Sequence, residues 1–370
     1  MSEENPAIVI DNGSGIIKAG FAGEEEPKTI FRTVIGRKEN FEDEKNIYFG
    51  EEILKEKGKF LINYPMEHGI ITNWDEMEKI WEHLFDHELK VETKEKSVLI
   101  TEPFLNPKSN REKMTEIMFE TFHVPNFYIA IQEVLSLYAS GRITGIVVQL
   151  GDGICSTFPI YEGLSLSHAA LRMNFGGRDI NDYLMKILTE RGYFFESAIS
   201  LEIVNEIKEK NCFVSLDFQQ EMEKAKNSNQ FEKNFQASDG NIYTIANERF
   251  RAPEVLFQPD LIGLEKKGID KMISNSILKC DVDLKKNLFE NIVLSGGSVL
   301  FQGMKERIEN EVIKFAPQSI KVKVDQDSNP KISTWIGGSI LASLTSLKTK
   351  WITQDDYDEF GFSIIHSKCF

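Results

Sequence analysis

The sequence predicts an α/β fold with at least two domains. Short apolar segments of strand character alternate with amphipathic helices, and one glycine-containing strand–turn–strand pattern occurs twice. The chain has 370 residues and a mass of 42.3 kDa. A single hydrophobic core usually stops growing at about 250–300 residues, so a chain of this length should divide. No linker rich in Pro, Gly or Ser is present, so we expect tightly joined domains between which the chain crosses more than once.

Four apolar segments are predicted to be short strands, because each is rich in strand-forming residues and ends in polar or glycine-containing residues. They are residues 8–11, 97–100, 145–148 and 291–294. Ligands of α/β proteins bind at the carboxyl ends of strands. The residues that follow these segments are therefore the first candidates for a binding site.

Amphipathic helices are predicted between the strands from apolar residues at helical spacing. The first is expected to begin at an Asn110 cap, the second to end before Gly192 and the third to stop at Pro317. We assign their apolar faces to core packing rather than to chemistry. These faces consist of Met114, Ile117, Met118 and Phe122, then Ile180, Leu184, Ile187 and Leu188, then Ile308, Val312 and Phe315.

The composition disfavours several classes of function. Forty-three Lys and Arg against 58 Asp and Glu give a net charge of −15, so we expect no nucleic-acid partner and no membrane insertion. The four cysteines are widely spaced without a C-x-x-C pair, which argues against a zinc site and a disulfide framework. The N-terminus is acidic and the longest uncharged run, residues 332–347, is broken by Ser, Thr and Gly. We therefore expect a soluble intracellular protein.

An internal repeat is the most informative feature of the sequence. Residues 8–16 (IVIDNGSGI) align without gaps to residues 146–154 (IVVQLGDGI). In each copy a strand enters a G-x-G turn and leaves as another strand, which predicts a hairpin because glycine tolerates positive φ. Either copy alone could be only a turn. Two such turns can face each other across a cleft and direct backbone N–H groups at a polyphosphate, so the duplication favours phosphate binding.

Three further features extend this interpretation. Lys18 follows the first turn and can add a positive charge beside phosphates. The pair Gly296–Gly297 ends a strand, and the pair Gly176–Gly177 opens a helix. Each pair could allow close approach of the backbone to a base or ribose, or could serve helix–strand packing.

Several longer stretches resemble the actin family, and the resemblance covers essentially the whole chain. They are residues 11–15 (DNGSG), 70–75 (IITNWD), 135–142 (LSLYASGR), 335–344 (WIGGSILASL) and 368–370 (KCF). The resemblance implies the two-lobed actin-like ATPase fold, also used by chaperones and sugar kinases of the hexokinase type. Each lobe of that fold has a β-sheet flanked by helices, and ATP or ADP binds between the lobes with Mg²⁺ or Ca²⁺.

The resemblance also implies domain boundaries. The first lobe would comprise residues 1–139 and 333–370, with a small subdomain at about 33–64. The second lobe would comprise residues 140–332, with a small subdomain at about 176–264. Hinges are expected near residues 132–140 and 331–335.

Carried over position by position, the resemblance implies a nucleotide site. One side of the phosphates would be held by Gly13, Ser14, Gly15 and Lys18, and the other by Gly151, Asp152, Gly153 and Ile154. The nucleoside and the nearby phosphate would be surrounded by Gly177, Lys208, Glu209, Gly297, Phe301 and Lys331. Asp11 would bind the metal through water, and Gln132 would position the attacking water as the catalytic residue. On sequence pattern alone, Lys208 and Glu209 would be interpreted as a solvated helix face.

Three positions depart from the family pattern. Gln149 stands where the family has an Asp beside the metal, and Ser156 replaces a His that helps to order water. Phosphoryl transfer depends on positioning and charge compensation, so we expect ATP to bind and its hydrolysis to be slower than in conventional actin. Leu150 replaces a small polar residue and could either crowd the γ-phosphate or fill the core.

The surfaces implied by the resemblance are mixed. Residues 37–50 are several residues shorter than the family's loop that inserts into the next subunit, and they carry Glu39, Glu42, Asp43 and Glu44. This predicts weaker filament contacts, although charge alone favours a simple solvated loop.

Residues 261–264 (LIGL) keep the apolar tip of the family's plug loop. An apolar cleft for actin-binding proteins is matched by Tyr138, Ile340, Leu341 and Leu344, with Lys350 at its rim.

We therefore expect a cytoplasmic, cytoskeletal ATP-binding protein that enters filaments with itself or with other actins. The alternative is a non-polymerising actin-like subunit of a complex that uses nucleotide as a structural switch. A sugar kinase or chaperone is the third hypothesis, but a kinase would need a catalytic carboxylate where this chain has Gln149.

Overall fold

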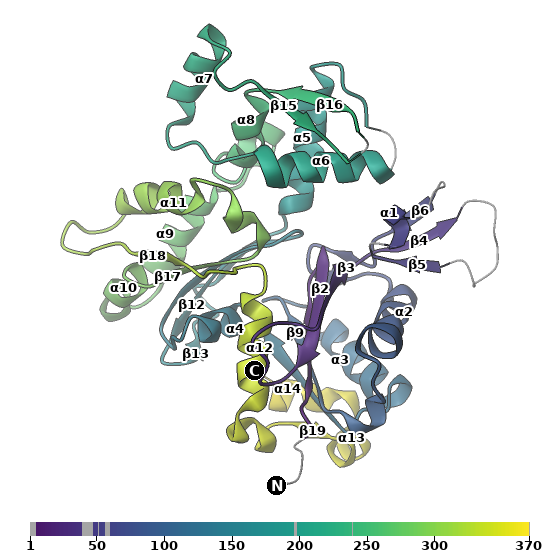
Figure 1. The fold of residues 1–370 in the computed structure, drawn as a ribbon. Coiled ribbons are helices and arrows are strands. Elements are labelled where there is room, and N and C mark those ends of the chain that lie inside the picture. Colours follow the sequence, from purple (N-terminus) through teal and green to yellow (C-terminus); the bar gives the residue numbers. More distant parts are fainter. Residues whose placement is uncertain are drawn as a thin grey trace. The chain divides into compact units, whose positions relative to one another are not determined.

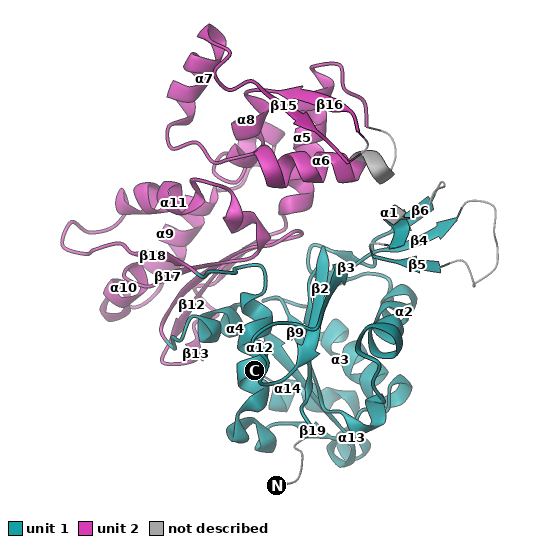
Figure 2. Ribbon diagram, in the orientation of Figure 1, with its two compact units in different colours: residues 1–143, 327–370 teal, residues 144–326 magenta. Residues whose placement is uncertain are grey.

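The computed structural model describes residues 5–38, 47–50, 52–55, 60–195, 198–238 and 240–369. The chain divides into two compact units (Figure 2). Unit 1 comprises Met1–Ile143 and Asp327–Phe370, and unit 2 comprises Thr144–Gln326. Each unit combines a sheet with helices, so the predicted α/β class is confirmed.

Unit 1 is built on a six-stranded sheet, of which Figure 1 labels four strands. β1 (Ile8–Asn12) is an interior strand of this sheet. β1 pairs in parallel with β9 (Val98–Glu102) and antiparallel with β2 (Ile16–Phe21). All residues of β1 and β9 are buried, as expected for strands covered on both faces. The sheet is completed by β10 (Asn126–Ile131), β3 (Thr29–Arg32) and β19 (Ile352–Thr353). The predicted strands at 8–11 and 97–100 are thereby confirmed.

Unit 2 repeats the same local arrangement. β11 (Gly145–Leu150) pairs antiparallel with β12 (Cys155–Tyr161) and in parallel with β17 (Ile292–Ser295). The sheet also contains β13 (Leu164–Ser165), β14 (Leu171–Met173) and β18 (Val324–Gln326). The predicted strands at 145–148 and 291–294 are confirmed, and each repeat forms the predicted hairpin.

The three predicted helices are present as α3 (Lys108–Glu116), α5 (Gly177–Thr189) and α11 (Met304–Ile313). Two predicted details are wrong. Asn110 does not cap α3: Pro107, whose ring fixes φ, occupies the cap, and the Asn110 side chain donates to the Ile71 carbonyl at 3.1 Å. Phe315 lies beyond the end of α11 with 42% of its surface exposed, so it does not belong to the core face.

The remaining elements complete the two units. In unit 1 they are β4 (Ile35–Lys38), β5 (Ile47–Phe49), α1 (Glu52–Lys55), β6 (Phe60–Asn63), β7 (Met66–Glu67), β8 (Ile70–Ile71), α2 (Trp74–His83), α4 (Gln132–Ala139), α12 (Ser333–Ser343), α13 (Gln354–Phe360) and α14 (Ile365–Lys368). In unit 2 they are α6 (Ala198–Asn211), α7 (Phe218–Asn227), β15 (Lys233–Gln236), β16 (Ile242–Ile245), α8 (Glu248–Glu254), α9 (Ile269–Lys279) and α10 (Val282–Phe289). A π-helix, Leu84–Leu89, continues α2.

Helices α4 and α12 pack at very short range within unit 1. A Cβ atom at Gly337 would lie 1.8 Å from the Leu135 carbonyl oxygen, so only glycine fits at this crossing. Trp335, two residues earlier on α12, is fully buried and donates its Nε1 hydrogen to the Val9 carbonyl at 3.0 Å. These contacts fasten the last part of the chain to the central strand β1.

A stack of rings links the small sheet β5-β4-β6 to α2. The rings of Phe49 and His83 stack with centroids 4.3 Å apart, and those of His83 and His87 stack at 5.1 Å. Burial lowers the pKa of His83 below 6.5, although the carboxylates of Glu52 and Glu88 act in the opposite direction. The folded protein therefore favours neutral His83.

His83→Phe should flatten the pH dependence of stability. Because the folded-state pKa lies below the unfolded value of 6.5, this contribution is fully present above pH 6.5 and is lost as the pH falls through the folded-state pKa. Denaturant unfolding between about pH 7.5 and 5.5 should show a steeper loss for the natural protein than for the variant. His168→Gln, at an exposed site in unit 2, is the control. Equal slopes for the natural protein and His83→Phe would contradict the assignment.

Candidate functional site

The first turn of the repeat joins β1 to β2, with Asp11 opposite Lys18 and Asn12 opposite Ile17. A Cβ atom at Gly13 would lie 2.6 Å from the Ile16 carbonyl oxygen, so this position requires glycine. The predicted reason, positive φ, is wrong for Gly13 and for Gly151, because neither has φ in the left-handed range. At Gly13 the reason for glycine is instead the close approach of two backbone segments.

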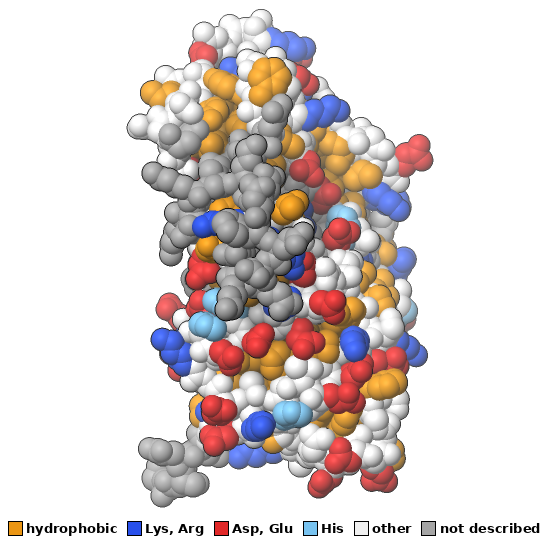
Figure 3. All heavy atoms as spheres, turned by 90° about the vertical axis from the view of Figure 1, so that its right-hand side faces the viewer, with side chains coloured by type: hydrophobic (Ala, Val, Ile, Leu, Met, Phe, Trp, Pro, Cys, Tyr) orange, Lys and Arg blue, Asp and Glu red, His pale blue; other side chains and the backbone are white. Residues whose placement is uncertain are grey.

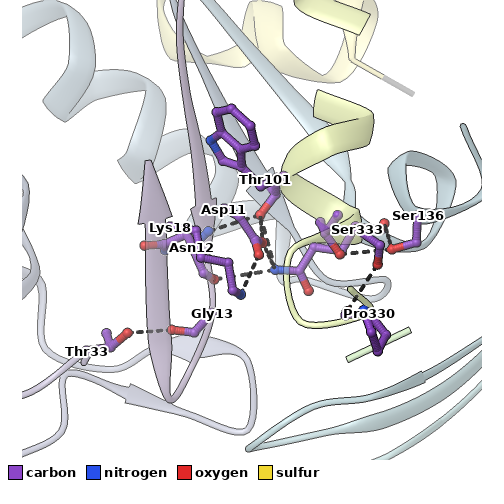
Figure 4. A network of polar contacts seen from close by, with 12 residues as sticks. Asp11, Asn12, Gly13, Lys18, Thr33, Thr101, Ser136, Pro330 and Ser333 are labelled. Atoms are coloured by element: carbon purple, nitrogen blue, oxygen red, sulfur yellow. Dashed lines mark hydrogen bonds and ion pairs between the residues drawn. The ribbon is translucent and has the colours of Figure 1, made fainter. Parts of the chain in front are cut away.

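Asp11 is the centre of a buried polar network in unit 1 (Figure 4). Its Oδ2 lies 2.7 Å from Nζ of Lys18, and its Oδ1 accepts hydrogen bonds from Thr101 Oγ1 at 2.9 Å and Gln132 Nε2 at 3.3 Å. Thr101 belongs to β9, and Gln132 opens α4 directly after β10. The neighbouring parallel strands β1, β9 and β10 thus bring Asp11, Thr101 and Gln132 to one edge of the sheet, and Lys18 joins them from the antiparallel strand β2.

The network also fixes the turn itself. Thr101 Oγ1 accepts from the Asn12 amide at 3.1 Å, and Thr33 Oγ1 donates to the Gly13 carbonyl at 2.6 Å. The Ser14 hydroxyl accepts a hydrogen bond from the Gly69 amide at 2.8 Å. The first turn is therefore held in one conformation by groups from three separate segments.

The second turn is held by the start of α5. The Gly177 amide donates to the Gly151 carbonyl at 3.0 Å, and the Arg178 amide donates to the Asp152 carbonyl at 2.9 Å. The Arg178 guanidinium also lies 3.2 Å from Oδ2 of Asp152. The ion pair and both amides fix the turn.

The two glycine pairs are explained in part by packing against this turn. A Cβ atom at Gly176 would lie 2.4 Å from the Asp152 carbonyl oxygen, and one at Gly296 would lie 2.4 Å from that of Leu150. Gly177 differs, because its open side faces polar groups: a Cβ there would lie 3.3 Å from both Asp152 Oδ1 and Lys208 Nζ.

Lys208 is buried, although the sequence pattern predicts a solvated position. It is only 6% exposed, and its Nζ donates to the Gly177 carbonyl at 2.9 Å. The pattern-based expectation of a solvated helix face is therefore wrong for Lys208, although the adjacent Glu209 is exposed. A buried ammonium group beside a glycine-lined turn is suited to binding an anion.

Gln149 and Ser156 face each other across the second hairpin. They are 7% and 1% exposed, and they occupy the same register position as Asp11 and Lys18 in the first hairpin. The two departures from the family pattern are therefore one cross-strand pair. Leu150 is fully buried in the core of unit 2, which accounts for it as a packing residue.

The structure groups the predicted site residues by unit. Unit 1 gathers Asp11, Gly13, Ser14, Gly15, Lys18 and Gln132, and also contains Lys331. Unit 2 gathers Gly151, Asp152, Gly153, Ile154, Gly177 and Lys208, and also contains Glu209, Gly297 and Phe301. Sequence reasoning missed Thr101, Thr33 and Arg178. Of these, Thr101 could have been found, because it directly follows a predicted strand.

A divalent cation would depend on few protein ligands. Among the described residues, no three His, Cys, Asp or Glu side chains gather where they could hold a metal ion. Asp11 fits the outer role that the resemblance implies, because its carboxylate is buried, fixed and placed beside a turn able to bind phosphate. The cation would then be held mainly by phosphate oxygens and water.

The predicted surfaces are partly visible. Ile340 on α12 and Leu344, which caps this helix, are 41% and 46% exposed, while Tyr138 and Leu341 pack partly against the core beneath them. Leu261, in the plug segment, is 40% exposed. Figure 3 shows acidic side chains spread over the face that carries α2, in keeping with the net charge of −15. The acidic loop residues Glu39, Glu42, Asp43 and Glu44 lie outside the described residues.

Across the described ranges, no helix is long and apolar enough to cross a bilayer.

Lys18→Met should destabilise unit 1 more than the double change Asp11→Asn/Lys18→Met. The single variant leaves a buried carboxylate without its cation, and breaking a buried pair in this way costs about 3–5 kcal/mol. In the double variant, the neutral amide keeps an oxygen for Thr101. Denaturant unfolding measures the difference, with Lys108→Met at an exposed site as control. A double variant as unstable as Lys18→Met would contradict the role of the ion pair.

The family model described as Actin matches residues 2–370, which is essentially the whole chain. This chain belongs to the actin family.

Proposed function

We propose that this protein is a cytoplasmic, cytoskeletal ATP-binding protein that enters filaments with itself or with other actins and hydrolyses ATP slowly. The observation that carries the proposal is the duplicated hairpin. Each copy has a glycine turn fixed by its surroundings, and each has a lysine nearby: the partly buried Lys18 in one copy and the buried Lys208 in the other. Such turns and cations are what a polyphosphate requires.

In the proposed mechanism, two lobes with the predicted boundaries enclose the nucleotide. The turns at 13–15 and 151–154 hold the phosphates from opposite sides, with Lys18 and Lys208 compensating their charge. Gly177, Glu209, Gly297, Phe301 and Lys331 surround the nucleoside. Mg²⁺ or Ca²⁺, when bound, would neutralise charge on the phosphate oxygens. Asp11 orders water around the ion.

Gln132 would hold the attacking water. Its side-chain amide already donates to Asp11 Oδ1 and to Thr101 Oγ1, at 3.3 and 3.1 Å, so the side chain is oriented before any ligand arrives. Orientation of this kind is the main protein contribution to phosphoryl transfer. The buried neutral pair Gln149–Ser156 offers less electrostatic assistance than a charged pair, which supports slow hydrolysis.

The second candidate is a non-polymerising actin-like subunit that uses nucleotide as a structural switch. Gln149 and the shortened 37–50 loop favour it. The exposed apolar side chains Leu261, Ile340 and Leu344 favour filament and partner contacts instead. A sugar kinase is disfavoured, because position 149 carries no carboxylate; a phosphotransfer screen tests this directly.

Lys208→Met should weaken ATP binding by about tenfold or more, because a charge-assisted contact to phosphate is lost. Displacement of a fluorescent ATP analogue measures the affinity. Lys210→Met is the matched control, since this lysine lies on the same helix with 61% of its side chain exposed. If both variants bind ATP as the natural protein does, Lys208 does not contact the phosphates.

The purified protein should pellet in Mg-ATP, alone or mixed with conventional actin, and should release phosphate more slowly than conventional actin. Leu261→Asp should reduce pelleting by placing a charge on an exposed apolar tip. Ile313→Asp, at a site with 51% exposure, is the control. A protein that binds ATP but stays soluble in both mixtures would establish the second candidate instead.

A further inference from the structure

The two hairpins place different chemistry at one register position. In the first hairpin the facing pair is Asp11 and Lys18, which form an ion pair at 2.7 Å. In the second hairpin the facing pair is Gln149 and Ser156, which carry no charge. Each pair is therefore electrically balanced within its own hairpin.

This balance is unusual for a site that would hold a polyphosphate with a divalent cation. Carboxylates near phosphates repel them unless a cation lies between, which makes nucleotide binding depend on that cation. Here the Asp11 carboxylate is already compensated by Lys18 and by hydrogen bonds from Thr101 and Gln132. No uncompensated carboxylate at this position therefore requires a metal ion before phosphates approach.

The surroundings of the second turn strengthen the argument. Asp152 is paired with Arg178, and the Asp179 carboxylate accepts from the Gly176 amide at 2.7 Å. Lys208 adds a positive charge that is buried beside Gly177. Because this charge belongs to a side chain, it remains in place when cations are removed from the solvent. The carboxamide of a glutamine can also donate a hydrogen bond to a phosphate oxygen, which a carboxylate cannot do.

We propose that Gln149 makes ATP binding by this protein independent of a divalent cation, with Lys208 as a permanent counter-charge to the triphosphate. This inference rests on the proposed binding of ATP and goes beyond it. The cation then serves hydrolysis, and affinity is set by the chain's own charges. Gln149 is the residue that determines whether ATP binding depends on the cation.

The test compares ATP affinity in excess Mg²⁺ with affinity in excess EDTA, by displacement of a fluorescent ATP analogue. For the natural protein, removal of the cation should change the dissociation constant less than about threefold. Gln149→Glu introduces a nearly isosteric carboxylate and should make binding in EDTA about 10–100-fold weaker than in Mg²⁺. Gln236→Glu, at an exposed site on β15, adds the same charge away from the turn and is the control.

A double variant with a new ion pair adds a second measurement, the melting temperature, which does not require nucleotide. Gln149→Glu/Ser156→Lys restores a cross-strand ion pair of the kind formed by Asp11 and Lys18. It should melt at a higher temperature in EDTA than Gln149→Glu alone, because the buried carboxylate regains a cation. It should also recover most of the ATP affinity lost in EDTA.

The possible outcomes are distinguishable. If the natural protein binds no ATP with or without Mg²⁺, the proposed function fails. If it binds ATP in Mg²⁺ but loses about tenfold or more in EDTA, the function stands and this inference fails. If Gln149→Glu remains as independent of the cation as the natural protein, Gln149 is not the determinant. The measurement on the natural protein decides the main question even if the variants do not fold.

Discussion

The burial of one carboxylate organises the first unit. Asp11 lies near the end of an interior strand, with only 4% of its side chain exposed, and a charge in such a place is tolerated only when it is paired and hydrogen-bonded. Lys18, Thr101 and Gln132 meet this requirement from β2, β9 and the start of α4. The same network therefore fixes the side-chain amide of Gln132, and Thr101 also accepts a hydrogen bond from the Asn12 amide at the start of the turn.

The second hairpin shows that the fold does not need this charge. It keeps the strand register and the glycine turn, and it fills the equivalent position with a neutral pair that is equally buried. Backbone pairing and apolar packing maintain the hairpin in both cases, so the facing pair is free to change its chemistry. A duplicated structural element has in this way acquired two different electrostatic characters within one chain.

Sequence reasoning identified the features that depend on local pattern. Apolar segments gave the positions of β1, β9, β11 and β17, and the repeat gave both hairpins. It failed where contacts link distant residues: the burial of Lys208 depends on the Gly177 carbonyl, 31 positions away. The requirement for glycine at 176 and 296 comes from the backbone of the second turn, and the cap of α3 was displaced by a neighbouring proline. Such constraints are tertiary and have no period in the sequence.

The attachment of α12 to β1 has a consequence for synthesis. Trp335 bonds to the Val9 carbonyl and β19 pairs with β10, so unit 1 contains chain from both ends. During translation, unit 2 is complete once residue 326 has emerged, whereas the central sheet of unit 1 still lacks its last strand and a covering helix. Strands β1 and β10 must therefore wait for residues that follow unit 2 in the sequence. A nascent chain that stalls soon after residue 326 would leave the apolar surface around Leu135 and Val9 uncovered.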